Sequence, residues 1–103
     1  MLHVTVAYPN TENTEFDHDY YFNRHLPLVR SRLGGALKRA EVDRALAGPE
    51  GSDPVWVASG HLFFDSMEAF QTSFGPHAEE ILGDIPNFTN VQPDLVISES
   101  VPA

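Results

Sequence analysis

The sequence predicts an α+β domain whose elements follow the order strand, helix, strand, strand, helix, strand. Two segments alternate polar and apolar residues with the period of two that is typical of strands. Two others carry apolar residues at helical spacing, behind residues that cap helices well. A chain of 103 residues is too short for two independent cores, so we expect residues 1–103 to form one domain.

The first strand is predicted over residues 2–8, which have two distinct faces. Leu2, Val4, Val6 and Tyr8 share one face, and His3, Thr5 and Ala7 share the other. A helix is then expected from Asp17, whose carboxylate can accept a first-turn N–H. Phe16 and Tyr21 stand at the two positions of a hydrophobic staple, and the glycines at 34–35 are expected to end the helix.

Pro27 interrupts the pattern of this first helix. It has no N–H for the carbonyl of Asn23, and its ring crowds that turn. We therefore expect a kink or break within residues 24–26, which would turn His25 away from a regular helical direction. The alternative is that Pro27 only begins a second helical segment.

The next elements are a charged edge strand within 37–46, a loop at 48–54 and a strand over 55–64. A second helix is expected to begin near Met67, to be interrupted at Gly75–Pro76 and to resume over 77–83. The last strand is expected at 95–99. The strand over 55–64 has the clearest alternation, and its small residues Ala58 and Gly60 would let a helix approach one face closely. Asp65 is the predicted cap of the helix that follows.

Two strand–helix units joined by a hairpin predict a ferredoxin-like fold, with a four-stranded antiparallel sheet and both helices on one face. The other sheet face then has nothing in the chain to cover it. Such a face is more stable covered when it carries several apolar residues, so we expect a homodimer with a cavity between two packed sheets.

Composition excludes several classes of function. The chain has no cysteine, so it has no disulfide, no thiolate metal site and no cysteine nucleophile. A net charge of −9 argues against nucleic-acid binding. No apolar run is long enough to cross a bilayer, and no secretory signal is visible, so we expect a cytoplasmic protein without membrane contacts.

All six basic residues fall between positions 24 and 44, where only two acids occur. The local net charge is therefore about +4, against −13 in the rest of the chain. One interpretation is a local positive field that attracts a small anionic substrate. The other is that Arg30 and Arg32 complement the carbonyl end of the first helix.

The run Phe16-Asp17-His18-Asp19-Tyr20-Tyr21-Phe22-Asn23-Arg24-His25-Leu26-Pro27-Leu28-Val29 resembles the signature of the EthD family, which is named for ethyl tert-butyl ether degradation. Gly60-His61-Leu62 and the run 84–89 are also similar to this family. The resemblance covers nearly the whole chain and implies a dimeric α+β barrel. It also implies a superfamily that includes cofactor-free isomerases, decarboxylases and dehydratases, and haem-handling enzymes.

Histidine chemistry is the expected chemistry. His25 is the first candidate base, with Tyr20 or Tyr21 about one turn earlier as a hydroxyl donor. Its alternative role is to bind the carbonyls that Pro27 leaves free. His61 is the second candidate, with a structural histidine as the alternative. The pocket is expected to include four further residues: Tyr8, Arg24, Phe63 and Phe88.

No metal site and no cofactor are expected, because metal-ligand spacings and a dinucleotide-binding glycine motif are missing. The superfamily resemblance leaves a haem held by a histidine open. We expect a small-molecule catabolic protein. It is either a cofactor-independent isomerase, decarboxylase or dehydratase acting on a small carbonyl or aromatic metabolite, or a non-catalytic homodimeric carrier or accessory protein of an oxygenase-type degradation pathway.

Overall fold

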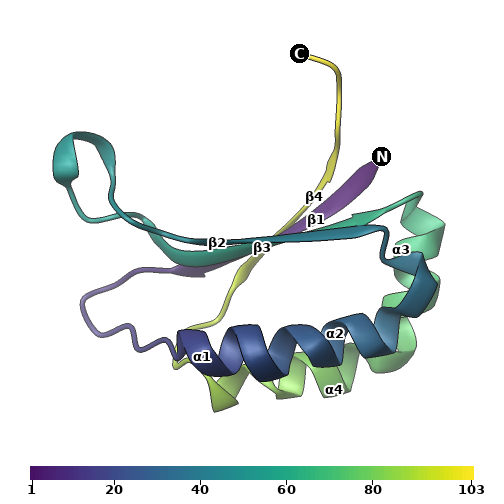
Figure 1. Cartoon of the computed structure of the whole chain (residues 1–103), viewed down its shortest axis with the longest axis horizontal. Helices are drawn as coiled ribbons and strands as arrows, with labels where there is room; N and C mark the ends of the chain where they lie inside the picture. Colours follow the sequence, from purple (N-terminus) through teal and green to yellow (C-terminus); the bar gives the residue numbers. More distant parts are fainter.

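The structure, a computed structural model covering residues 1–103, is a four-stranded antiparallel sheet with its α-helices on one face (Figure 1). The strands are β1 (Leu2–Pro9), β2 (Arg39–Arg44), β3 (Trp56–Phe64) and β4 (Asp94–Glu99). Their spatial order is β2-β3-β1-β4, with every neighbouring pair antiparallel. This confirms the predicted ferredoxin-like fold.

The helical layer consists of two interrupted helices. The α-helical segments are α1 (His18–Tyr20), α2 (Leu26–Leu33), α3 (Met67–Phe74) and α4 (Ala78–Gly83). Short 3-10 turns follow α2, α3 and α4, at Gly34–Ala36, Gly75–His77 and Ile85–Asn87. The predicted interruption at Gly75–Pro76 is therefore present, and it separates α3 from α4.

The chain does not break at Pro27, although the helix is irregular just before it. Residues Tyr21–His25 form a π-helical turn, in which the N–H of Leu26 bonds to the carbonyl of Tyr21, five residues back. This wider turn relieves the crowding that the proline ring would cause at the carbonyl of Asn23. Single π turns of this kind occur frequently at functional sites, and this one ends at His25.

The cap predicted for the first helix is confirmed, and the cap predicted for α3 is wrong by one residue. The carboxylate of Asp17 accepts the N–H of Tyr20 at 3.1 Å, as expected. The cap of α3 is Ser66, whose hydroxyl accepts the N–H of Ala69 at 3.0 Å, and not Asp65. Asp65 instead lies 3.8 Å from the Lys38 ammonium, where both side chains are largely exposed.

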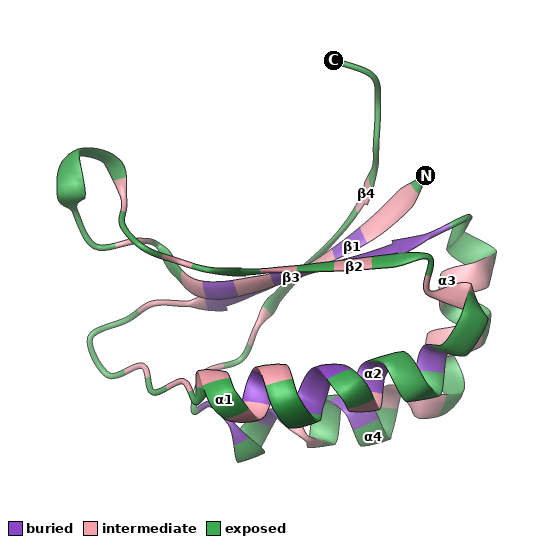
Figure 2. Ribbon diagram, in the orientation of Figure 1, coloured by how far each residue is buried: buried purple, intermediate pink, exposed green.

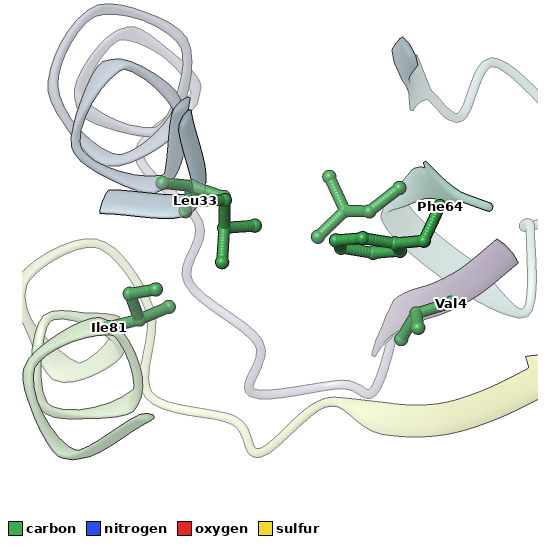
Figure 3. Close-up of a cluster of buried hydrophobic side chains, with 6 residues drawn as sticks. Val4, Leu33, Phe64 and Ile81 are labelled. Atoms are coloured by element: carbon green, nitrogen blue, oxygen red, sulfur yellow. The ribbon is translucent and has the colours of Figure 1, made fainter. Parts of the chain in front are cut away.

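The core lies between the sheet and the helices. Side chains from α2 and α4 meet the helix-facing sides of β1 and β3, and the first core cluster contains Val4, Val29, Leu33, Leu62, Phe64 and Ile81. Figure 3 shows Leu33 and Ile81 pointing from their helices toward Val4 and Phe64. In Figure 2 the buried positions of α2 and α4 face the sheet, whereas the outer side of each helix is exposed.

The second face of the sheet is open, as predicted, but it is more polar than expected. β2 contributes Arg39, Glu41 and Asp43 to it, opposite Phe63, His61 and Ser59 of β3. The Arg39 guanidinium lies 4.1 Å from the centre of the Phe63 ring and covers part of it. The charged edge strand thus screens the largest apolar side chain of this face within the same chain. No helix of the structure is long and apolar enough to span a membrane.

Candidate functional site

Four polar side chains meet at the C-terminal end of α4. The Nδ1 atom of His25 lies 2.9 Å from Oδ2 of Asp84, and the Tyr20 hydroxyl donates to Oδ1 of the same carboxylate at 2.7 Å. The side-chain amide of Asn87 donates to Oδ1 as well, at 2.9 Å. Asp84 therefore connects a histidine and a tyrosine of the first helical segment to the turn that follows α4.

The irregular helix explains why His25 can reach Asp84. His25 is the last residue of the π turn, and the whole residue is only 4% exposed. Its ring stacks on Tyr21, with 5.8 Å between the ring centres, and packs against Phe88 at 4.7 Å. The imidazole is thus fixed between two aromatic rings, and a carboxylate orients it at one nitrogen.

The hydrogen bond to Asp84 determines which nitrogen of His25 carries the proton. A carboxylate can only accept, so Nδ1 of His25 is the donor. Burial lowers the pKa of His25 below its ordinary value, although the hydrogen bond and the charge of Asp84 act in the opposite direction. The ring is therefore neutral at pH 7, and its Nε2 atom holds a free lone pair.

Asp84 keeps its charge in this setting. Its partial burial raises the pKa of the carboxyl group, but the hydrogen bonds from Tyr20, Asn87 and His25 outweigh that effect and hold the pKa below its usual value. The same hydrogen bond raises the pKa of the Tyr20 hydroxyl. Tyr20 and His25 therefore each hold one oxygen of the Asp84 carboxylate, and the Tyr20 hydroxyl is directed at this carboxylate.

An apolar cavity lies beside His25, between the sheet and the helices. Its volume is about 70 Å³, and thirteen of the fifteen residues that line it are hydrophobic. Three of the lining residues, His25, Tyr21 and Tyr8, carry a polar group in the side chain. A cavity of about 150 Å³ holds benzene in another protein, so this one accepts a small organic molecule or one end of a larger one.

The tyrosine hydroxyls at the cavity have no hydrogen-bond partner in the protein. Tyr8 and Tyr21 are 1% and 2% exposed, and neither hydroxyl forms a hydrogen bond within the chain, although neither hydroxyl oxygen is itself completely buried. Burial raises the pKa of both hydroxyls well above the ordinary value, so they stay protonated. Each is available to donate to an oxygen atom of a ligand.

The absence of a side chain at Gly60 leaves room for the Tyr21 hydroxyl. A Cβ atom at position 60 would lie 2.8 Å from Oη of Tyr21, a distance that real Cβ contacts do not allow. The glycine on β3 thus leaves room for the hydroxyl at the sheet surface. The sequence predicted close approach at this position by a helix, and the structure shows that a tyrosine ring from the helix fills the space.

The predicted site residues divide between the two sides of the sheet. The cavity side brings together Tyr8, Tyr21 and His25, with Tyr20 and Phe88 packed behind them. Arg24 is exposed and does not line the cavity. His61 and Phe63 point to the open face, because their neighbours Gly60 and Leu62 face the helices, so neither shares a site with His25.

His61 has partners of its own on the open face. Its Nε2 atom lies 3.0 Å from Asp43, and its Nδ1 atom lies 3.1 Å from the Thr5 hydroxyl. Both ring nitrogens of His61 therefore have partners within the chain. This arrangement agrees with the structural role that the sequence analysis gave as the alternative to a catalytic one. The site residue that the sequence analysis missed is Asp84, whose only signal was its place in the family-like run 84–89.

The basic residues do not create a cationic pocket. None of the six lines the cavity. Arg32 forms two hydrogen bonds to Glu80, at 2.6 and 3.0 Å, and so joins α2 to α4 at the surface. A carboxylate ligand inside the cavity would therefore face no cation, and the cavity favours an uncharged ligand.

The residues fit neither a metal ion nor a haem. No group of three or more His, Asp or Glu side chains is arranged to bind a metal. A haem held by His25 would have to fit a cavity of about 70 Å³, which is less than half the volume that holds benzene.

The fold and the site define a ferredoxin-like α+β protein with an apolar cavity and a buried histidine–aspartate pair beside it. The EthD domain model matches residues 9–92, and the chain belongs to the EthD family. An EthD-like protein from Ralstonia eutropha JMP134 is 45% identical with a TM-score of 0.92, over 98% of this chain and 92% of that one.

Two more distant structures share the fold. An ethyl tert-butyl ether degradation family protein from Bacillus halodurans is 22% identical with a TM-score of 0.70, covering 98% of this chain and 99% of that one. A monooxygenase from Streptomyces coelicolor, solved with the ligand nanaomycin D, is 13% identical with a TM-score of 0.65, covering 99% and 88%. A search of proteins with curated functions gave no match.

Proposed function

We propose that the chain is a small-molecule catabolic protein that binds an uncharged, mostly apolar carbonyl compound in the cavity and moves a proton on it. The observation that carries this proposal is that three residues with polar side-chain groups, His25, Tyr8 and Tyr21, line an otherwise apolar cavity. The ligand complex of the S. coelicolor fold neighbour supports binding of a small organic molecule.

The roles of these groups follow from their protonation states. Nε2 of His25 removes a proton from the carbon next to the carbonyl, and Asp84 stabilises the imidazolium that forms. The Tyr21 or Tyr8 hydroxyl donates to the carbonyl oxygen, where negative charge develops in the enolate. Returning the proton to a different carbon gives an isomerase, and expelling a leaving group from the enolate gives a lyase.

Exchange of α-protons tests this proposal without knowledge of the natural substrate. The protein is incubated with 2-butanone in D₂O, and loss of the α-proton signals is followed by ¹H NMR. Positioned general bases contribute about 10²- to 10⁴-fold, so we expect exchange at least about 100-fold faster with the wild type than with His25→Gln. His61→Gln, on the opposite face of the sheet, should exchange like the wild type.

A non-catalytic carrier is the second candidate. The strongly raised pKa values of Tyr8 and Tyr21 favour it, because hydroxyls that stay protonated hold a carbonyl well but are poor proton donors. A carrier would bind 2-butanone, detected by saturation-transfer NMR, without accelerating exchange. Equal exchange rates for the wild type and His25→Gln would contradict the catalytic proposal and support the carrier.

We also propose that the protein is a homodimer that joins two copies through the open sheet face. The apolar side chains of this face that support the proposal are Val57, which is partly exposed, and Val96, which is 54% exposed in the single chain. Light scattering after size exclusion should give about twice the chain mass of 11.4 kDa. A mass of one chain at micromolar concentration would contradict the dimer.

A further inference from the structure

The cavity beside His25 leads to a groove on the surface of the molecule. This groove is lined by nine residues of the segment from Leu82 to Leu95. Three of them, Leu82, Ile85 and Leu95, also line the cavity. The two spaces therefore meet at these three side chains, and a molecule in the groove is one side-chain layer away from the cavity.

Two of the shared residues are well placed to open and close this connection. Leu82 comes from α4 and Leu95 from β4, and their exposed fractions are 42% and 54%. Ile85 is only 8% exposed and forms a fixed floor. Exposed leucine side chains change rotamer within nanoseconds and need no backbone movement to do so.

The position of β4 explains why these leucines are exposed. β4 is an edge strand, and the helices cover only part of its helix-facing side, where Ile97 is also 45% exposed. By contrast, Val4 and Leu62, on the two central strands β1 and β3, are 4% and 9% exposed. The helical layer thus leaves a gap in its cover over β4, next to the cavity.

Two of the three polar side chains that line the groove, Thr89 and Asn90 but not Gln92, already form hydrogen bonds within the protein. Thr89 donates its hydroxyl to the carbonyl of Glu15 at 2.6 Å. Asn90 bonds to the N–H of Glu15 and to the carbonyl of Asn13, each at 2.9 Å. These bonds hold the walls of the groove in place and leave few polar groups free to bind a ligand. The groove is therefore better suited to let a ligand pass than to bind it.

We infer that ligands enter the cavity between α4 and β4, and that Leu82 and Leu95 form the gate. This inference rests on the proposed function, because it assumes that the cavity binds a ligand. The size of the cavity supports it: at about 70 Å³ it holds only part of an aromatic ring, so the trailing atoms of a ring compound extend through the passage toward the groove.

The exchange kinetics of 4-fluorophenol, followed by ¹⁹F NMR, test the gate. In Leu95→Trp a larger side chain obstructs the passage, and we expect association and dissociation to slow together by at least about tenfold, a barrier higher by about 1.4 kcal/mol. The dissociation constant should change much less than either rate, because a gate affects both rates alike. Leu82→Ala should accelerate both rates.

Leu46→Trp is the matched control, because it makes the same substitution away from the passage. Leu46 is 91% exposed in the loop after β2, and it lines neither the cavity nor the groove. Its rates should equal those of the wild type. Thermal unfolding of each variant shows whether the fold is intact, and Leu82→Ala tests the gate independently if Leu95→Trp does not fold.

The outcomes separate the gate from the proposed function. Exchange rates in Leu95→Trp and Leu82→Ala equal to those of the wild type would overturn the gate and leave ligand binding intact. A weaker dissociation constant with an unchanged association rate would also overturn it, because the leucines would then be binding contacts. If the wild type does not bind 4-fluorophenol and does not exchange the protons of 2-butanone, the proposed function and the gate both fail.

Discussion

Replacing Asp84 with asparagine changes the charge and proton arrangement of the site at nearly constant shape. The asparagine oxygen still accepts the Tyr20 hydroxyl that lies 2.7 Å from Oδ1 of Asp84. Its amide nitrogen, however, then faces Nδ1 of His25 at the position where Oδ2 lies 2.9 Å away. Nδ1 must then accept instead of donate, so the proton moves to Nε2 and the base is lost.

The effect of Asp84→Asn on stability follows from the bond to His25. A hydrogen bond to a charged group contributes about 1.5–3 kcal/mol and a neutral one about 0.5–1.5 kcal/mol, so this buried bond weakens by about 1 kcal/mol. The contacts from Tyr20 and Asn87 lie nearer the surface and add little. We expect a total loss of about 1–2 kcal/mol and a melting temperature lower by about 4–16 °C.

The loss should depend on pH with a definite sign. The pKa of Asp84 is lower in the folded state than its ordinary value of 3.8, so the stability it contributes is present above that pH and disappears as the pH falls through the folded pKa. Urea unfolding at pH 7 should therefore separate the wild type from Asp84→Asn, and the difference should shrink below pH 3.8. A difference of equal size at pH 7 and pH 3 would refute the reasoning.

Three further changes test the packing around the site. Gly60→Ala should cost about 1–3 kcal/mol in a urea titration, because its Cβ would displace the fixed Tyr21 hydroxyl 2.8 Å away. Ser66→Ala should lower the unfolding free energy by about 1 kcal/mol through loss of the α3 cap, whereas Asp65→Ala should change it by less than about 0.5 kcal/mol. Leu33→Ala, at a core position 3% exposed, should cost about 2–5 kcal/mol by the same assay.

The strands of the sheet could be predicted because their alternation is a local property. β1, β3 and β4 begin and end within one residue of the predicted limits. The cap of α3 was assigned one residue too early, because Asp65 and Ser66 are both good capping residues and only the backbone angles decide between them. The π turn was predicted only as an irregularity near Pro27, since its form depends on the packing of Tyr21 and His25 against the sheet.

The candidate site was harder to predict than the fold. His25 and its neighbouring tyrosines carried a local signal, but Asp84 lies 59 positions further along the chain and meets His25 only in the folded structure. The alternation of β3 already separated His61 from Gly60, yet it did not tell which face the helices cover. The charge pattern suggested an anion site, whereas the structure uses Arg32 and Arg39 at the surface.

The tautomer of His25 is the property on which the proposed chemistry depends most directly. Two-dimensional ¹H–¹⁵N NMR of protein labelled in its imidazole rings measures it, with His25→Gln used to assign the signals. We expect a neutral ring at pH 7 that carries its proton on Nδ1 and titrates below pH 6.5, the ordinary value for histidine. A proton on Nε2, or a doubly protonated ring at pH 7, would contradict the account.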